Sequence, residues 1–327
     1  MIRRRPIALA APCGVWCKIA HKFLCGALLL SAPWQPAWAE IAAITSQSAG
    51  ALTLVDTETM TIRASVPLPG KPAAVAVDGP RGRIMAVAVE TAKLHVFDLA
   101  GQSLAVHDLP GAPFGLAIRP ETGSALVTDW TGHLLEVDPG TGRILTRWDT
   151  GAVPSGVAAS GDGLIVTADR DADQLSLIDA QGPRVVPVGH HPFGVTIYEN
   201  RVFVTNVLSD TVSVIDPDTA RVTATIPVGE RPYAVAFAQG RGFVTNQYGA
   251  SLTVFDAETL AVIGQVETDE YPEGIAATAD GHLLVANWFS DTVQQIDAAA
   301  MRVVQTIAVA EGPRAFGTFI APAPPEP

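Results

Sequence analysis

The sequence predicts an all-β fold, a seven-bladed β-propeller, and two repeated residues with their spacing support that prediction. An Asp ends an apolar segment at seven positions, Asp56, Asp98, Asp138, Asp179, Asp216, Asp256 and Asp297. A Pro opens the next apolar segment at seven more, Pro72, Pro113, Pro154, Pro192, Pro232, Pro272 and Pro313. Both series repeat about every 40 residues, the period typical of one four-stranded propeller blade. Seven repeats therefore predict seven blades.

One repeat shows how each blade is built from four antiparallel strands, which we name A to D. Residues 232–237 form strand A, 243–246 strand B, 251–255 strand C and 260–266 strand D. Strand C alternates polar and apolar residues, as a strand does when its two faces differ. Asp256 follows it, and its carboxylate can accept backbone N–H groups of the next turn. The recurrent Thr-Asn pairs at the end of strand B are interpreted in the same way, as turn hydrogen bonding.

Strand A is rich in Ala, which predicts that it lies innermost, because side chains near the axis must be small. The order of strands also predicts how the ring closes. Residues 41–68 supply strands B, C and D without a preceding strand A, whereas 313–320 supply a strand A with nothing after it. We therefore expect the C-terminal strand to pair into the N-terminal blade. The propeller is then expected to span 40–320, followed by a Pro-rich disordered tail over 321–327.

Residues 1–39 read as a secretory signal peptide. The segment begins with basic residues, continues with an apolar run over 23–32 and ends in Ala37-Trp38-Ala39, a pattern of small residues typical of cleavage. Cleavage after Ala39 predicts a periplasmic or secreted bacterial protein. The apolar run is too short to span a bilayer, which disfavours the alternative of an uncleaved anchor. No membrane span is expected in the mature chain.

Composition narrows the classes of function. All three Cys residues lie in the leader, at 13, 17 and 25, so the remaining chain offers no disulfide and no c-type haem attachment motif. We expect no bound cofactor. The formal net charge is −12, and it becomes more negative without the basic leader. Such acidity argues against nucleic-acid binding, which needs clustered Lys and Arg.

The residues of the fifth repeat resemble a known family. The segments FVTN at 203–206, DTVSVID at 210–216, VTATIPVG at 222–229 and RPYAVAF at 231–237 look like the YVTN-type repeat of YncE-like exported β-propellers. The resemblance is weaker in the first three repeats, where Ala88-Val89 replaces Thr-Asn. It implies a WD40-like propeller exported from the cell but little about function, since related propellers include lactonases and subunits of quinoprotein dehydrogenases. Fold analogy does not choose among these roles.

Strand direction places the D–A and B–C loops on one face, around a central channel. Aromatic residues on loops suggest a recognition surface for a ligand or partner, although the same rings could instead pack together to seal the channel. Glu273 and Arg314 occupy equivalent positions in adjacent repeats, where they could orient a substrate or form a structural ion pair. The candidate rim comprises Phe114, Asp129, Trp130, Phe193, Tyr233, Tyr248, Glu273, Trp288, Phe289 and Arg314.

Metal-binding and catalytic patterns are weak. Asp169, Asp171 and Asp173 have the spacing of a calcium loop, but Gln174 and Ala180 stand where that loop needs Gly and Glu. The adjacent pair His190-His191 lacks an evident third zinc ligand. The sequence shows no nucleophile elbow, no HExxH motif and no phosphate loop. These five residues remain weak metal candidates, and no catalytic residue is assigned.

The favoured interpretation is an exported, non-catalytic propeller that binds a protein partner or a small ligand at the D–A/B–C face. The alternative is a periplasmic enzyme or enzyme subunit, either a lactonase-like hydrolase or the companion of a quinoprotein dehydrogenase. A third interpretation, a purely structural cell-surface repeat, predicts no specific ligand.

Overall fold

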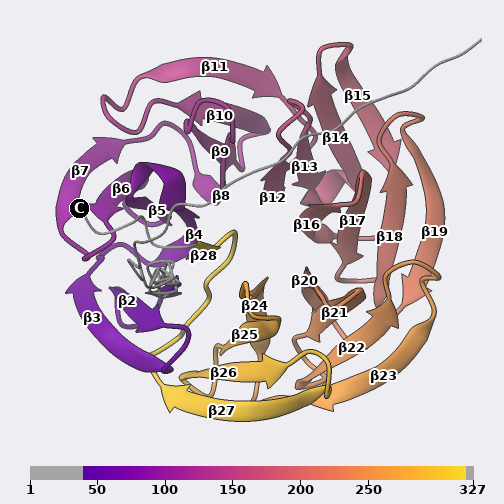
Figure 1. Ribbon diagram of the computed structural model, residues 1–327. Coiled ribbons are helices and arrows are strands. Elements are labelled where there is room, and N and C mark those ends of the chain that lie inside the picture. Colours follow the sequence, from indigo (N-terminus) through magenta and orange to yellow (C-terminus); the bar gives the residue numbers. More distant parts are fainter. Residues whose placement is uncertain (1–39, 322–327) are drawn as a thin grey trace, which may run out of the picture. The chain divides into compact units, whose positions relative to one another are not determined.

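A computed structural model of the protein describes residues 40–321, which form seven four-stranded antiparallel sheets arranged as the blades of a ring (Figure 1). The predicted fold class is confirmed. The signal peptide predicted for 1–39, and all but the first residue of the tail predicted for 321–327, lie outside the described residues.

The first sheet has the order β28 (Ile320–Ala321), β1 (Ile41–Ser46), β2 (Ala51–Asp56) and β3 (Thr61–Pro67). The other six sheets each use four consecutive strands. They are β4 (Pro72–Asp78), β5 (Arg83–Ala88), β6 (Lys93–Asp98) and β7 (Ser103–Asp108); β8 (Pro113–Ile118), β9 (Ala125–Asp129), β10 (His133–Val137) and β11 (Ile144–Asp149); β12 (Pro154–Ala159), β13 (Ile165–Asp169), β14 (Gln174–Asp179) and β15 (Gly182–Pro187); β16 (Pro192–Tyr198), β17 (Arg201–Asn206), β18 (Thr211–Asp216) and β19 (Arg221–Pro227); β20 (Pro232–Ala238), β21 (Arg241–Asn246), β22 (Ser251–Asp256) and β23 (Val262–Glu267); β24 (Pro272–Ala277), β25 (His282–Asn287), β26 (Thr292–Asp297) and β27 (Arg302–Ala308). Two short 3₁₀ turns, η1 (Gly79–Arg81) and η2 (Arg170–Ala172), complete the described elements.

The strand that begins at each of the first six repeated Pro residues lies innermost, as its small residues predict. Inner strands of neighbouring sheets contact one another, for example β4 with β8 and β20 with β24 (Figure 1). The second and third strands carry most of the largest fully buried side chains, such as Phe203, Phe243 and Leu94. The fourth strand is largely exposed. The core therefore lies between the blades and is formed mainly by the first three strands of each sheet.

The seven repeated Asp residues perform one structural task. In every sheet the carboxylate that ends the third strand accepts one or two backbone N–H groups from the turn that follows. In the sixth repeat, for example, Asp256 accepts the N–H of Thr259 at 2.8 Å. The turn predicted from the sequence is confirmed, and it explains why Asp recurs at this position.

Acid should destabilise the protein through these turns. The N–H of Gly140 holds the pKa of Asp138 below its ordinary value, and the N–H of Thr259 does the same for Asp256. A carboxyl group whose pKa is lower in the folded chain stabilises the fold above its unfolded pKa, about 3.9, and this contribution is lost as pH falls through the folded pKa. We expect the urea midpoint of Asp256→Asn, which keeps a turn acceptor but cannot titrate, to fall less between pH 5 and pH 3 than that of the wild type. Parallel curves for the two proteins would contradict this assignment.

The ring closes in the predicted sheet but not by one regular strand. Ile320 pairs with Ala42, and Ala321 pairs with Ile41, so β28 completes the sheet of β1. The expected strand over 313–320 is shortened to 320–321. Gly317 has a φ of 121°, a backbone conformation that favours glycine, and the chain changes direction there.

The residues before β28 divide their hydrogen bonds between two neighbouring strands. Toward β1, the N–H of Arg314 donates to the carbonyl of Thr45 at 2.8 Å. Toward β4, the carbonyls of Phe316 and Thr318 each accept an N–H at 2.9 Å, from Val75 and Val77. This closing segment, residues 313–321, therefore joins two blades, and a regular strand in one sheet cannot do that.

Glycine recurs at the third position of four inner strands because neighbouring blades meet there. An added Cβ at Gly156 would lie 2.2 Å from the carbonyl oxygen of Phe193 in the next blade. The same crowding occurs at Gly115, Gly194 and Gly274. We expect Gly156→Ala to destabilise the protein by about 1–3 kcal/mol, the usual cost of overpacking. The control is Ala234→Gly, the reverse change at the equivalent position of β20, whose cost in urea denaturation should be smaller. Equal costs would show that contact with the next blade does not matter.

Candidate binding face

The Pro ends of the inner strands are closed by four packed aromatic rings. Phe193 lies 4.3 Å from Tyr233, 5.1 Å from Phe316 and 5.7 Å from Phe114, measured between ring centroids. All four side chains are buried. We call these four residues the aromatic plug. Three of its members were predicted as rim residues, and the structure places them in the closed centre of the face, as the sealing alternative expects.

A buried ion pair lies beside the aromatic plug. Arg314 Nε donates to Glu273 Oε2 at 2.7 Å, and Gln247 Nε2 donates to Glu273 Oε1 at 2.7 Å. The Arg314 guanidinium also donates to the Tyr233 hydroxyl. Burial raises the pKa of Glu273, while the charge and hydrogen bonds of Arg314 oppose that rise. Both carboxylate oxygens are engaged by side chains of the protein, so the geometry favours the structural ion pair over a substrate-orienting role.

Other aromatic residues of the same face are exposed or half-buried and adjoin one another. Tyr271 lies 5.1 Å from Tyr248 and 4.1 Å from Phe289, and Phe289 lies 4.6 Å from Trp288. Tyr248 is 53% exposed and Phe289 is 54% exposed. Three loops carry these residues: β21–β22, β23–β24 and β25–β26. We call Tyr248, Tyr271, Trp288 and Phe289 the outer aromatic patch. The sequence identified all of them except Tyr271 as rim candidates.

The remaining two rim candidates differ in exposure. Trp130 stacks on Phe114 at 4.7 Å and is 36% exposed, with the Arg170 guanidinium 5.0 Å from its ring. Asp129 is buried, and its carboxylate accepts the N–H of Ala112 at 2.8 Å and the N–H of Thr131 at 3.0 Å. Burial opposes ionisation of Asp129, but a hydrogen bond from Thr131 Oγ1 at 2.6 Å, together with these two bonds, holds its pKa below the ordinary value. Asp129 thus organises the loop that presents Trp130.

The weak metal candidates do not converge. Asp169 is buried and accepts hydrogen bonds from Gly151 N–H and Ser176 Oγ, and burial raises its pKa. Asp173 contacts His190 Nδ1 at 2.7 Å and, separately, accepts the N–H of His191 at 2.8 Å. Within residues 40–321, no three His, Cys, Asp or Glu side chains gather as metal ligands would.

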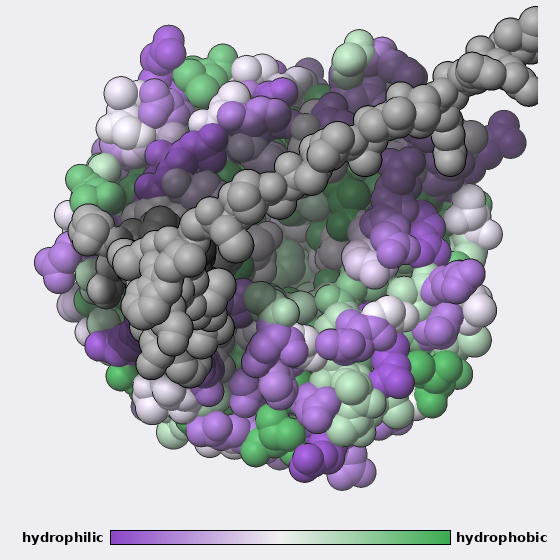
Figure 2. All heavy atoms as spheres, in the orientation of Figure 1, coloured by the Kyte–Doolittle hydropathy of each residue, from purple (hydrophilic) through white to green (hydrophobic). Residues whose placement is uncertain are grey.

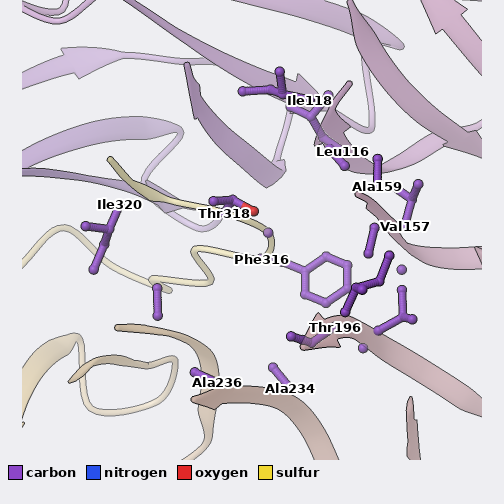
Figure 3. Close-up of a pocket in the computed structure, with 18 of the residues that line it drawn as sticks. Leu116, Ile118, Val157, Ala159, Thr196, Ala234, Ala236, Phe316, Thr318 and Ile320 are labelled. Atoms are coloured by element: carbon purple, nitrogen blue, oxygen red, sulfur yellow. The ribbon is translucent and has the colours of Figure 1, made fainter. Parts of the chain in front are cut away.

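The sequence predicts a central channel but does not indicate a ligand pocket within it. A pocket of about 600 Å³ lies between the downstream halves of the inner strands, beyond the aromatic plug (Figure 3). Figure 2 shows the centre of the ring hollowed, with hydrophobic residues in the hollow. The small residues of the inner strands are the signal that could reveal it, although close packing near the axis requires small residues as well.

A membrane-spanning helix is not found among residues 40–321: none of their helical segments is long and apolar enough.

Comparison with known proteins supports the fold and leaves the function open. No family model matches the chain, and no curated protein matches it. Among solved structures, a functionally unknown protein from Desulfotomaculum acetoxidans DSM 771 is similar with a TM-score of 0.75 and 14% identity, over 88% of this chain and 99% of that one. The dihydro-heme d1 dehydrogenase NirN, solved in complex with DHE, is similar with a TM-score of 0.63 and 15% identity, over 82% of this chain and 63% of that one. A streptogramin B lyase has a TM-score of 0.65 and 15% identity, over 77% and 91%. At these identities the likeness shows the β-propeller fold alone.

Proposed function

We propose that this protein is an exported, non-catalytic binding protein of the YVTN-repeat type, and that it recognises a protein partner through the outer aromatic patch. The observation that supports this most is the adjoining of four aromatic side chains on exposed loops, two of them more than half exposed. Aromatic residues are enriched among the few that supply most of the energy of a protein interface.

At the exposed rings of Tyr248 and Phe289, a protein partner is favoured over a small ligand for a geometric reason. Small ligands are usually held in concave pockets that cover most of their surface. The centre of this face is filled by the aromatic plug and the Glu273–Arg314 pair, whereas the outer aromatic patch lies on three loops and exposes two of its rings by more than half. Arg231 lies 5.6 Å from the Tyr248 ring and adds a cation beside the patch. Exposed rings flanked by a charge suit a broad contact.

Site-specific photocrosslinking in the native cells tests the proposal. p-Benzoylphenylalanine is placed at Tyr248 or Phe289, and as controls at Ile62 or Leu104, which are exposed on the outer strands β3 and β7. We expect both patch positions to crosslink the same protein and the controls to leave it uncaptured. Purified partner should then bind the Phe289→Ser variant about tenfold or more weakly than the wild type. The proposal is wrong if patch and control positions capture the same set, or if the variant binds equally well.

The intact mass of the isolated protein, measured by mass spectrometry, tests export and cleavage. Protein isolated from the native envelope fraction should have the intact mass of a chain beginning at Glu40, as the Ala37-Trp38-Ala39 pattern predicts. A chain retaining residues 1–39 in that fraction, or a protein confined to the cytoplasm, would contradict cleavage after Ala39. A redox subunit or a divalent metal that copurifies in stoichiometric amount would favour the enzyme alternative instead.

A further inference from the structure

The pocket within the ring is lined by the inner strands, mostly with apolar side chains. Its walls are the downstream halves of the inner strands, contributing residues such as Leu116, Val157, Ala159 and Ala236 (Figure 3). The Phe316 ring lies among these side chains and belongs also to the aromatic plug, which closes the other end. A volume of about 600 Å³ falls in the range of pockets that enclose a small molecule.

Charge is nearly absent from the lining. Among the described residues that line the pocket, only Asp78 and Arg81 are charged. Arg81 contacts Asp78 at 3.3 Å, and Arg83 contacts the same carboxylate at 3.0 Å. Both guanidinium groups also donate to backbone carbonyls of the β8–β9 loop, so this cluster is held by partners within the protein. The lining residues from β8, β12, β16, β20 and β24 carry no charge, so an ion placed among them would lose its hydration without a partner of opposite charge. The lining therefore selects against charged ligands.

The strand edges, together with the hydroxyl groups of Thr196, Tyr198 and Thr318, supply the uncharged polar groups of this pocket. β8, β12, β16, β20 and β24 are each the edge strand of a sheet, and the pocket is lined by residues of all five. An edge strand presents backbone N–H and C=O groups that its own sheet leaves unpaired. On β4 the closing segment takes up such groups, at Val75 and Val77. The wall thus combines apolar side chains with backbone donors and acceptors.

We propose that this pocket is a second binding site, for an uncharged and mainly apolar small molecule that carries a few hydroxyl or carbonyl groups. The apolar body of the ligand packs against the aliphatic side chains and the Phe316 ring, and its polar groups bond to the strand edges. The site is separate from the outer aromatic patch, so either proposal can fail while the other holds.

Fluorescence titration with N-phenyl-1-naphthylamine, an uncharged apolar probe, tests the site. We expect saturable binding of one probe per chain and much weaker binding of the anionic 8-anilinonaphthalene-1-sulfonate. Thr318→Phe and Ala159→Phe place a ring in the pocket at two positions that are not fully buried, and each should weaken binding of the uncharged probe by about tenfold or more. Thr318→Val, which adds almost no volume, and Leu104→Ser on β7 should bind as the wild type does.

A separate measurement of folding distinguishes loss of probe binding from loss of structure. Each variant should keep the circular dichroism spectrum of the wild type, and two filling variants guard against one that fails to fold. The proposal is overturned if folded filling variants bind the probe normally, if binding does not saturate at one site, or if the anionic probe binds as tightly as the uncharged one.

Discussion

Ending the chain after Gly312 is expected to leave a protein that does not fold cooperatively. The missing segment carries Phe316, Phe319 and Ile320, all buried, and it pairs with both β1 and β4. Each large buried apolar side chain contributes about 1.5–3 kcal/mol, so three of them approach the roughly 5–15 kcal/mol by which a typical native protein is stable. Loss of the melting transition, followed by circular dichroism, is the measurement.

Two further chains make this result specific. Phe319→Ala removes one fully buried ring and should cost about 3–5 kcal/mol while leaving a measurable transition. A chain that ends at Ala321 keeps every described contact and should melt as the full-length protein does. A chain ending at Gly312 that melted at the wild-type temperature would show that the ring does not depend on this closure.

Arg314→Met is expected to destabilise the protein by about 3–5 kcal/mol, because it leaves the buried carboxylate of Glu273 without its cation. The double variant Glu273→Gln/Arg314→Met removes both charges and keeps an acceptor for Gln247. It should recover much of the loss. The four urea denaturation curves form a double-mutant cycle, and additive effects of the two substitutions would contradict a coupled pair.

The Arg314→Met variant should also respond to pH in a defined direction. Burial already raises the pKa of Glu273, and loss of Arg314 removes an opposing influence. When the pKa of a carboxyl group is higher in the folded chain than in the unfolded chain, folding favours the protonated form. The free-energy cost of ionising the group in the folded chain therefore appears as pH rises from the unfolded pKa to the folded pKa. The deficit relative to the Glu273→Gln/Arg314→Met variant should therefore shrink as pH is lowered toward the unfolded pKa. A deficit that grows on acidification would contradict this.

The sequence predicted those parts of the structure that are repeated. Asp256 and its six counterparts determine the turns, and the repeated Pro residues mark the inner strands, because both act through local backbone geometry. Blade number and the site of closure follow from counting. The course of the closing segment could not be predicted, because residues 313–319 hydrogen-bond to strands of two sheets and local backbone preferences do not reveal the second strand.

The candidate rim was harder to predict because its exposure depends on how tightly seven strands converge. Phe114 and Tyr248 both lie at the same face, yet the first is buried among the rings of the aromatic plug and the second is more than half exposed on the β21–β22 loop. The role of the repeated Thr residues was equally hard to predict from the sequence. Thr245 Oγ1 accepts the N–H of Ala234 and donates to the carbonyl of Glu273 in the next blade, so it connects blades rather than forming a turn.

The mixed origin of the first sheet has a consequence for biosynthesis. A ribosome releases β1, β2 and β3 first, but the strand that covers their inner edge is made only after six other sheets. Until residue 320 emerges, that edge stays open to pairing with any other extended chain. Slow translation or crowding of nascent chains would therefore favour incorrect strand pairing at the amino-terminal sheet.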